Sequence, residues 1–228
     1  MDGLFNGGVL DSFFGPGIES HPLPFFPNTD MNIARRQMSS LMRHCRYVVV
    51  SGNTFQSRRP PRGGVRAVDL VATEALVTGN RAVGYPIFVA LKNGGIPPHN
   101  WPNMFPGGGL MILDNTTENV PIFASAEWQL DGPGGEQRPH VIRGNTATGL
   151  DTILRIDHSH DFEFRKVEIR GNRLAGEKRP QVVILRRIAD RVHNVRIGPN
   201  EISGEARPPV VDEKGQPLED VDVRVEQQ

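Results

Sequence analysis

One short motif recurs along the chain at intervals that are too long for hairpins and too regular for chance. It is an asparagine, usually preceded by glycine, and it occurs at Asn53, Asn80, Asn115, Asn145, Asn172 and Asn200. These asparagines are 27, 35, 30, 27 and 28 residues apart. A shared period of this length is typical of a solenoid, in which each repeat forms one coil and stacks on the next.

The residues around each asparagine keep one pattern through all six repeats. The positions five and three before it and two after it are apolar with few exceptions, as with Val167, Ile169 and Leu174 around Asn172. Because apolar and polar residues alternate, each repeat is predicted to contain strands with one face turned inward. Asparagine tolerates the left-handed backbone region and glycine adopts it without cost, so the motif predicts a sharp turn. Stacked ~4.8 Å apart, the asparagines are expected to form a hydrogen-bonded ladder.

The repeat predicts an all-β fold, a single-stranded right-handed parallel β-helix of about six to seven coils over residues 47–228. A Gly-, Pro- and Asn-rich loop insertion at 92–109 accounts for the 35-residue interval. Residues 30–46 are predicted to form an amphipathic capping helix, because the end of a solenoid needs a cover. Residues 1–29, rich in Phe, are predicted to be an extended aromatic N-terminal arm that packs along the β-helix or inserts into a partner. A β-sandwich is the alternative, but its turns would recur every 8–12 residues or so without a longer frame.

The overall composition limits the classes of partner. The chain has 228 residues, with 26 Lys+Arg and 26 Asp+Glu, so its net charge does not favour nucleic acid. One cysteine, Cys45, excludes an internal disulfide framework. No apolar run approaches the ~18 residues of a membrane span, and the N-terminus lacks the basic region of a signal peptide. No cofactor and no metal are predicted.

A cluster of ionisable residues follows the fourth asparagine of the series. Its candidates for a catalytic or metal-binding role are Asp157, His158, His160 and Asp161. The coil pattern from Tyr47 to Gly204 resembles the pectate-lyase-like β-helix superfamily, and Ile156-Asp157-His158 resembles the Ile-Asp-His segment that its lyases often carry on a strand. The resemblance implies a polysaccharide lyase or hydrolase. The acidic calcium-binding run and the downstream catalytic Arg motif of those lyases have no clear counterpart, so no catalytic residue is assigned.

Two further sets of residues are candidates for binding. Arg59, Arg179 and Arg207 each precede a proline, six or seven residues after an asparagine of the series, and are predicted to stack into one basic ridge. Such a ridge could contact acidic sugars or an acidic protein surface, or simply be solvated. In the insertion, Trp101 and Phe105 are too apolar for a fully exposed loop, so they are expected to fold back onto the solenoid or to pack against a neighbour.

These features favour a structural protein over an enzyme. The leading hypothesis is a non-enzymatic, receptor-facing virion protein of a phage, tailspike-like or a capsid decoration, because similar β-helices serve in such particles. It would be a homotrimer in the virion that contacts other virion proteins and a surface polysaccharide. The alternatives are the polysaccharide lyase or hydrolase and a carbohydrate-binding module, although Trp101 and Trp128 are few for sugar-stacking platforms.

Overall fold

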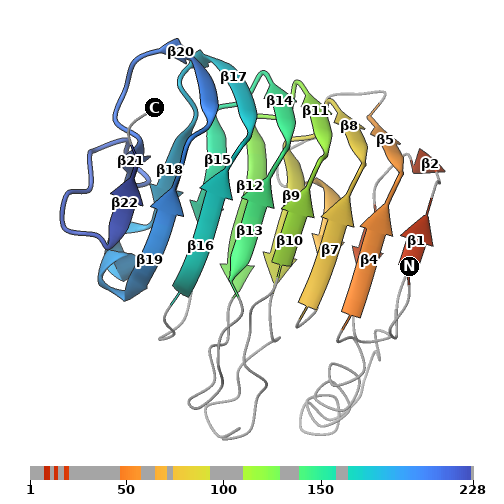
Figure 1. Cartoon of the computed structure of the whole chain (residues 1–228), viewed down its shortest axis with the longest axis horizontal. Coiled ribbons are helices and arrows are strands. Elements are labelled where there is room, and N and C mark those ends of the chain that lie inside the picture. The colour runs from red at the N-terminus through yellow and green to blue at the C-terminus, as the bar shows by residue number, and fades with distance from the viewer. Residues whose placement is uncertain are drawn as a thin grey trace, which may run out of the picture.

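The structure is a parallel β-solenoid in which each coil passes through three sheets in turn (Figure 1). It is a computed structural model that describes residues 8–10, 13–14, 18–20, 47–57, 65–70, 74–92, 110–128, 139–157 and 164–226. All strand pairs within the three sheets are parallel, and the six asparagines of the sequence repeat span five complete turns. The predicted all-β parallel β-helix is therefore confirmed.

The three sheets contain eight, seven and seven strands. Sheet 1 is formed by β1 (Gly8–Leu10), β4 (Tyr47–Ser51), β7 (Glu74–Thr78), β10 (Leu110–Leu113), β13 (His140–Arg143), β16 (Phe164–Arg170), β19 (Val192–Ile197) and β22 (Val223–Val225). Sheet 2 is formed by β2 (Phe13–Phe14), β5 (Thr54–Gln56), β8 (Arg81–Val83), β11 (Thr116–Glu118), β14 (Thr146–Thr148), β17 (Arg173–Lys178) and β20 (Glu201–Glu205). Sheet 3 is formed by β3 (Ile18–Ser20), β6 (Arg66–Leu70), β9 (Ile87–Lys92), β12 (Ile122–Trp128), β15 (Thr152–Ile156), β18 (Gln181–Ile184) and β21 (Val210–Val211). A short 3-10 helix, η1 (Arg186–Arg191), joins β18 to β19.

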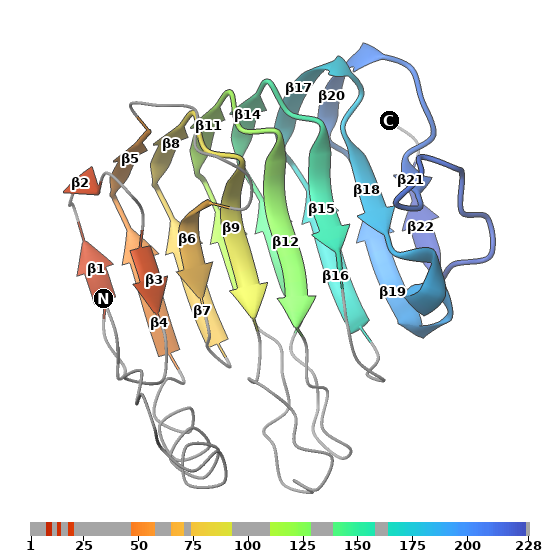
Figure 2. The same cartoon turned by 180° about the vertical axis from the view of Figure 1, so that it is seen from behind.

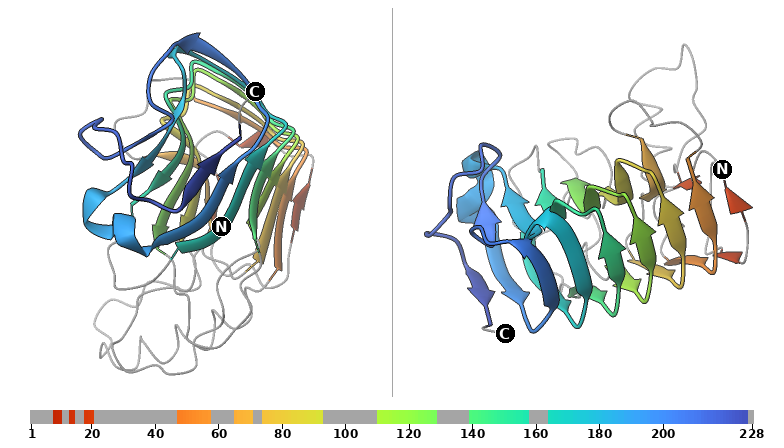
Figure 3. Two further views of the ribbon diagram at one scale, coloured as in Figure 1. Left: turned by 60° about the vertical axis from the view of Figure 1, so that its left-hand side comes forward. Right: turned by 90° about the horizontal axis from the view of Figure 1, so that it is seen from above.

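The direction of the coil can be followed in two views. In Figure 1 the strands of sheet 1 run upward at the front, and the chain then crosses the top through sheet 2. The strands of sheet 3 run downward in front in the reverse view (Figure 2). Because successive coils advance from right to left in Figure 1, the solenoid is right-handed, and Figure 3 shows the three sheets enclosing one interior.

The six asparagines form the predicted ladder at the turn from sheet 1 to sheet 2. From Asn53 to Asn172, each one donates its backbone N–H and its Nδ2 to the Oδ1 of the next asparagine, over 2.8–3.1 Å. Each Nδ2 also donates to the backbone carbonyl two residues earlier, as Asn145 does to Arg143. All six side chains are buried, so these bonds satisfy polar groups that water does not reach.

The expectation that the asparagines supply the left-handed residue of the turn is wrong. Positive φ belongs to the residue before, at Gly52, Gly79, Asp114, Gly144 and Gly171, and to none of the six asparagines. In the coil of Asn200 the preceding residue is Pro199, and it has no positive φ either. The two residues of the motif have different roles. The residue before the asparagine, usually glycine, adopts the left-handed conformation of the turn, and the asparagine supplies the side-chain hydrogen bonds.

The inward columns of the repeat form the core. Val48, Ala75, Leu110, Val167 and Val195 are all buried five residues before their asparagines, and so are the residues three before. Neighbouring coils interlock in sheet 3, where the rings of Phe88 and Phe123 lie 5.3 Å apart. Stacking therefore buries one continuous apolar interior that no single coil could bury alone.

The N-terminal part departs from a simple extended arm. Within residues 1–29, β1, β2 and β3 pair in parallel with β4, β5 and β6, so these three strands add one coil to the solenoid. The rest of the arm, the capping helix at 30–46 and residues 93–109 of the insertion lie outside the described residues.

Candidate functional site

Two of the three arginines of the predicted ridge lie on adjacent coils. Arg179 follows β17 and Arg207 follows β20, and the Nε of Arg207 donates to the Arg179 carbonyl oxygen at 2.6 Å. The backbone N–H of Arg179 in turn donates to the Glu205 carbonyl oxygen at 2.9 Å. Arg59 lies outside the described residues. The stacking of Arg179 and Arg207 follows from the 28-residue period.

The guanidinium groups of the two arginines differ in their hydrogen-bond partners. The Nη2 of Arg207 donates to the backbone carbonyl oxygen of Asp151 at 2.7 Å and to its Oδ1 at 2.6 Å, across two coils. Arg179 is exposed, and its guanidinium has no hydrogen bond or ion pair within the described part of the chain. Arg207 therefore links its own coil to the two coils before it through hydrogen bonds, whereas the charge of Arg179 is available to solvent or to a ligand.

Of the ionisable cluster at 157–161, the structure describes Asp157. This residue follows the end of β15, and its Oδ2 accepts a hydrogen bond from the Nη2 of Arg155 at 2.6 Å. His158, His160 and Asp161 lie outside the described residues, as do Trp101 and Phe105. Among the residues that are described, no three His, Cys, Asp or Glu side chains come together as a metal site. No described helix has the length and apolar character to cross a membrane.

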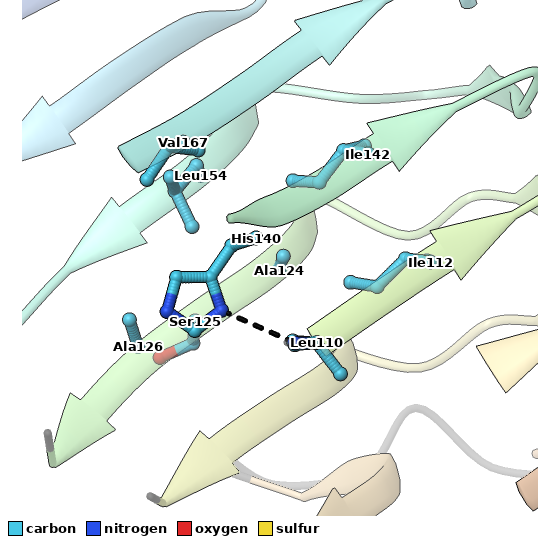
Figure 4. A pocket seen from close by; sticks show the side chains of 9 residues that line it. All are labelled: Leu110, Ile112, Ala124, Ser125, Ala126, His140, Ile142, Leu154 and Val167. Carbon is cyan, nitrogen blue, oxygen red and sulfur yellow. Dashed lines mark hydrogen bonds between the residues drawn. The ribbon is translucent and has the colours of Figure 1, made fainter. Parts of the chain in front are cut away.

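A buried histidine occupies one place in an otherwise apolar column. His140 stands five residues before Asn145, and its ring points between β12 and the neighbouring strands of sheet 1 (Figure 4). Its Nδ1 accepts a hydrogen bond from the backbone N–H of Leu110 at 3.4 Å. A small cavity of about 20 Å³, lined mainly by apolar side chains such as Ile112, Leu154 and Val167, adjoins the ring.

This environment favours the neutral imidazole. Burial lowers the pKa of His140 from 6.5 to about 4, because the apolar interior does not solvate the charged ring. The sequence placed His140 at an inward position but did not identify it as a titratable core group. The sequence feature that could have identified it is that His140 is the one ionisable residue in a column that otherwise holds Val, Ala or Leu.

The outer face of sheet 1 carries a line of apolar side chains that the sequence analysis missed. Val49, Leu76, Met111 and Val141 are register partners on four successive coils, and we call them the outer seam. Met111 is 40% exposed and the other three are half-buried. The seam could have been found from the sequence, because the position four residues before the asparagine is apolar in the first four repeats.

Beyond these four coils the same column becomes charged. Glu168, Arg196 and Arg224 continue it on β16, β19 and β22. This one outward column of sheet 1 is thus apolar from β4 to β13 and charged from β16 to β22.

Comparisons with known proteins add no relative. No protein-family model matches the chain, and no significant match was found among the curated proteins or the solved structures. The parallel β-solenoid is therefore established by the structure itself.

Proposed function

We propose that this chain is a non-enzymatic structural protein that assembles side by side as a homotrimer, with a phage virion as the particle it serves. The observation that carries the proposal is the outer seam. Val49, Leu76, Met111 and Val141 form an apolar column that follows the solenoid axis, and the same column is charged from β16 onward. Met111 is exposed and the other three side chains are half-buried, and a contiguous apolar line that solvent reaches in this way supports a role as a protein interface.

The geometry of the seam suits side-by-side packing around a common axis. Successive coils repeat at ~4.8 Å, so copies aligned in parallel can place each seam residue against its equivalents. The ladder supports a rigid shaft, because it ties each coil to the next through buried hydrogen bonds. A rigid shaft with a lateral apolar seam is the form expected of a tailspike-like or capsid-decoration protein.

Receptor contact is part of the proposal. Arg179 is exposed and without an ion pair among the described residues, which supports a role for the arginine ridge in binding an acidic surface polysaccharide. Of the residues that carry the resemblance to lyases of this fold, the described Asp157 has its carboxylate paired with Arg155, which supports the non-enzymatic assignment.

The oligomeric state of the full chain tests the proposal. Light scattering coupled to size-exclusion chromatography is expected to give a mass three times the 25.2 kDa of the chain. Met111→Glu, which places a charge in the seam, is expected to yield monomers. Thr146→Glu is the matched control, because Thr146 is exposed on the outer face of sheet 2, and it should leave the trimer intact.

Two results would overturn the proposal. One is a chain that stays monomeric at every concentration. The other is a trimer that survives Met111→Glu unchanged. The particle assignment has its own check, which is to detect the chain by mass spectrometry in virions purified from cells that carry its gene.

A further inference from the structure

Four exposed arginines lie on the outer face of sheet 1, beyond the outer seam (Figure 1). They are Arg143 of β13, Arg170 of β16, Arg196 of β19 and Arg224 of β22. Arg143 and Arg170 are register partners on adjacent coils, and so are Arg196 and Arg224. Like charges directly opposite one another on adjacent strands destabilise a sheet, so each pair costs stability that a bound anion would restore.

Sheet 2 shows the opposite arrangement. Its charged side chains meet partners of the other sign across adjacent coils, with Arg173 and Glu201 at 2.9 Å and Arg81 and Glu118 at 2.8 Å. Arg173 and Glu201 are also register partners. The stacked arginines of sheet 1 therefore depart from the charge pairing that the same solenoid uses on its next face.

The acidic neighbours separate the two arginine pairs. Asp222 and Glu226 stand two residues before and after Arg224, and Glu168 is the register partner of Arg196. Three carboxylates therefore surround the pair of Arg196 and Arg224 and balance its charge. The positive charge that is least compensated belongs to the other pair.

The side chain of Arg143 leans toward the coil of Arg170. Its Cγ lies 3.9 Å from the position of a Cβ on Gly171, so it extends over the following coil and away from Asp114 on the preceding one. The Arg143 guanidinium has no hydrogen bond or ion pair within the described part of the chain. The Nε of Arg170 lies 3.6 Å from the Oε2 of Glu168, which is too long for a hydrogen bond and joins two side chains that water reaches. Both guanidinium groups are thus available to a ligand.

We infer that Arg143 and Arg170 form a site for a sulfate or phosphate group of an acidic polysaccharide. This inference rests on the receptor contact proposed above, and it names the charged group of the ligand and the residues that bind it. Each guanidinium is a planar fork that donates two parallel hydrogen bonds to an oxyanion. A carboxylate offers one fork its two oxygens, whereas a sulfate or phosphate group has a third oxygen for the second fork. The stacked pair therefore favours a tetrahedral oxyanion over a carboxylate.

The open position of the site favours a polymer over a free ion. Water and salt screen a single ion bound on an exposed face. A polymer with repeated sulfate or phosphate groups gains a further contact with Arg196 on the next coil once its first group is bound. Arg143 stands two residues before Asn145 and the seam residue Val141 stands four before it, so the site lies beside the outer seam rather than on it.

Three dextrans with the same backbone serve as probes. Fluorescein-labelled dextran sulfate, carboxymethyl dextran of equal charge density and neutral dextran are titrated with the full chain, and their anisotropy is followed. Dextran sulfate is expected to bind saturably, carboxymethyl dextran at least about fivefold more weakly, and neutral dextran not at all. Inorganic sulfate should displace dextran sulfate better than sodium chloride of equal ionic strength, because it competes for the guanidinium forks as well as screening charge.

Variants of the chain locate the site. Arg143→Gln and Arg170→Gln should each weaken the binding of dextran sulfate at least about threefold. Arg81→Gln is the matched control, because it removes the same charge from an exposed arginine on sheet 2, and it should leave binding unchanged. Arg179→Gln tests the arginine ridge as the alternative place of contact. Circular dichroism checks that all four variants are folded.

Several results would overturn the inference. They are equal binding of the sulfated and carboxylated dextrans, equal effects of Arg143→Gln and Arg81→Gln, and a loss of binding in Arg179→Gln without one in Arg143→Gln. Inorganic sulfate that binds as tightly per group as dextran sulfate would make a free ion the ligand. Light scattering on the same samples keeps this test apart from that of the trimer: a monomer that binds dextran sulfate retains the site, and a trimer that does not bind it lacks the site.

Discussion

Asn145 and Asn172 stack directly on one another: both the backbone N–H and the Nδ2 of Asn145 donate to the Oδ1 of Asn172, at 3.0 and 2.9 Å. The Nδ2 of Asn172 donates in turn to the carbonyl oxygens of Ile142 and Arg170. One amide side chain thus serves the coil on each side of it. A residue that only shaped the turn would not need this side chain.

The first prediction separates the ladder from the turn. Asn172→Val should lower the free energy of unfolding by about 2–4 kcal/mol, because it leaves buried donors and acceptors without partners. Gly171→Ala should cost only about 1–2 kcal/mol, since the φ of 63° is strained for alanine while the nearest side-chain atom is 3.9 Å from the added Cβ. Urea denaturation of the two variants measures both values. A smaller effect for Asn172→Val than for Gly171→Ala would contradict the role given to the ladder.

The second prediction concerns acid. His140 has a folded-state pKa of about 4 against 6.5 in the unfolded chain, so between these values the unfolded state binds more protons. Above pH 6.5 the ring is neutral in both states, and His140 does not lower the free energy of unfolding. As the pH falls from 6.5 toward 4, protonation of the unfolded state lowers that free energy by up to about 3 kcal/mol. His140→Leu, which matches the apolar residues of that column, should remove this loss.

The unfolding free energies of the natural chain and of His140→Leu are measured at about pH 7.5 and about pH 4.5, and the difference between the two proteins is compared at the two pH values. The other ionisable groups are common to both proteins and cancel in the difference. Parallel stability curves for the two proteins over this range would show that His140 is not the group responsible.

The third prediction distinguishes the two arginines of the ridge. Arg207→Ala should lower the unfolding free energy by about 1–2 kcal/mol, because Arg207 donates to the carbonyl of Arg179 and to Asp151 two coils away. Arg179→Ala should change it by less than about 0.5 kcal/mol, since its exposed side chain has no bond within the described residues. A double-mutant cycle of Arg207→Ala with Asp151→Ala measures the coupling between the two side chains, and zero coupling would refute a stabilising link between these coils.

The fourth prediction is the absence of lyase activity. Incubation with acidic polysaccharides should give no increase in the ultraviolet absorbance of new unsaturated ends. Proton abstraction needs an available base and a cation beside the substrate, and the carboxylate of Asp157 is already bound by Arg155 at 2.6 Å. Robust cleavage that disappears in His158→Ala would reverse this conclusion and favour the enzyme.

Much of the fold could be predicted because its order is local and periodic. The alternation around Asn172, with Val167, Ile169 and Leu174 inward, determines which face of each strand is buried. The spacing of the asparagines gives the coil length, and the identical frame requires them to align. The same frame places Met111 of the outer seam at an outward position, four residues before Asn115.

The sequence alone determined the inward columns and the asparagine ladder, since side-chain alternation and a constant period act within each repeat. Tertiary structure decided the properties that depend on which atoms meet between coils. It paired Arg207 with Asp151, 56 residues apart, and enclosed His140 among apolar side chains that lower its pKa. Distances across coils, and the exclusion of water from them, arise only when the coils are stacked.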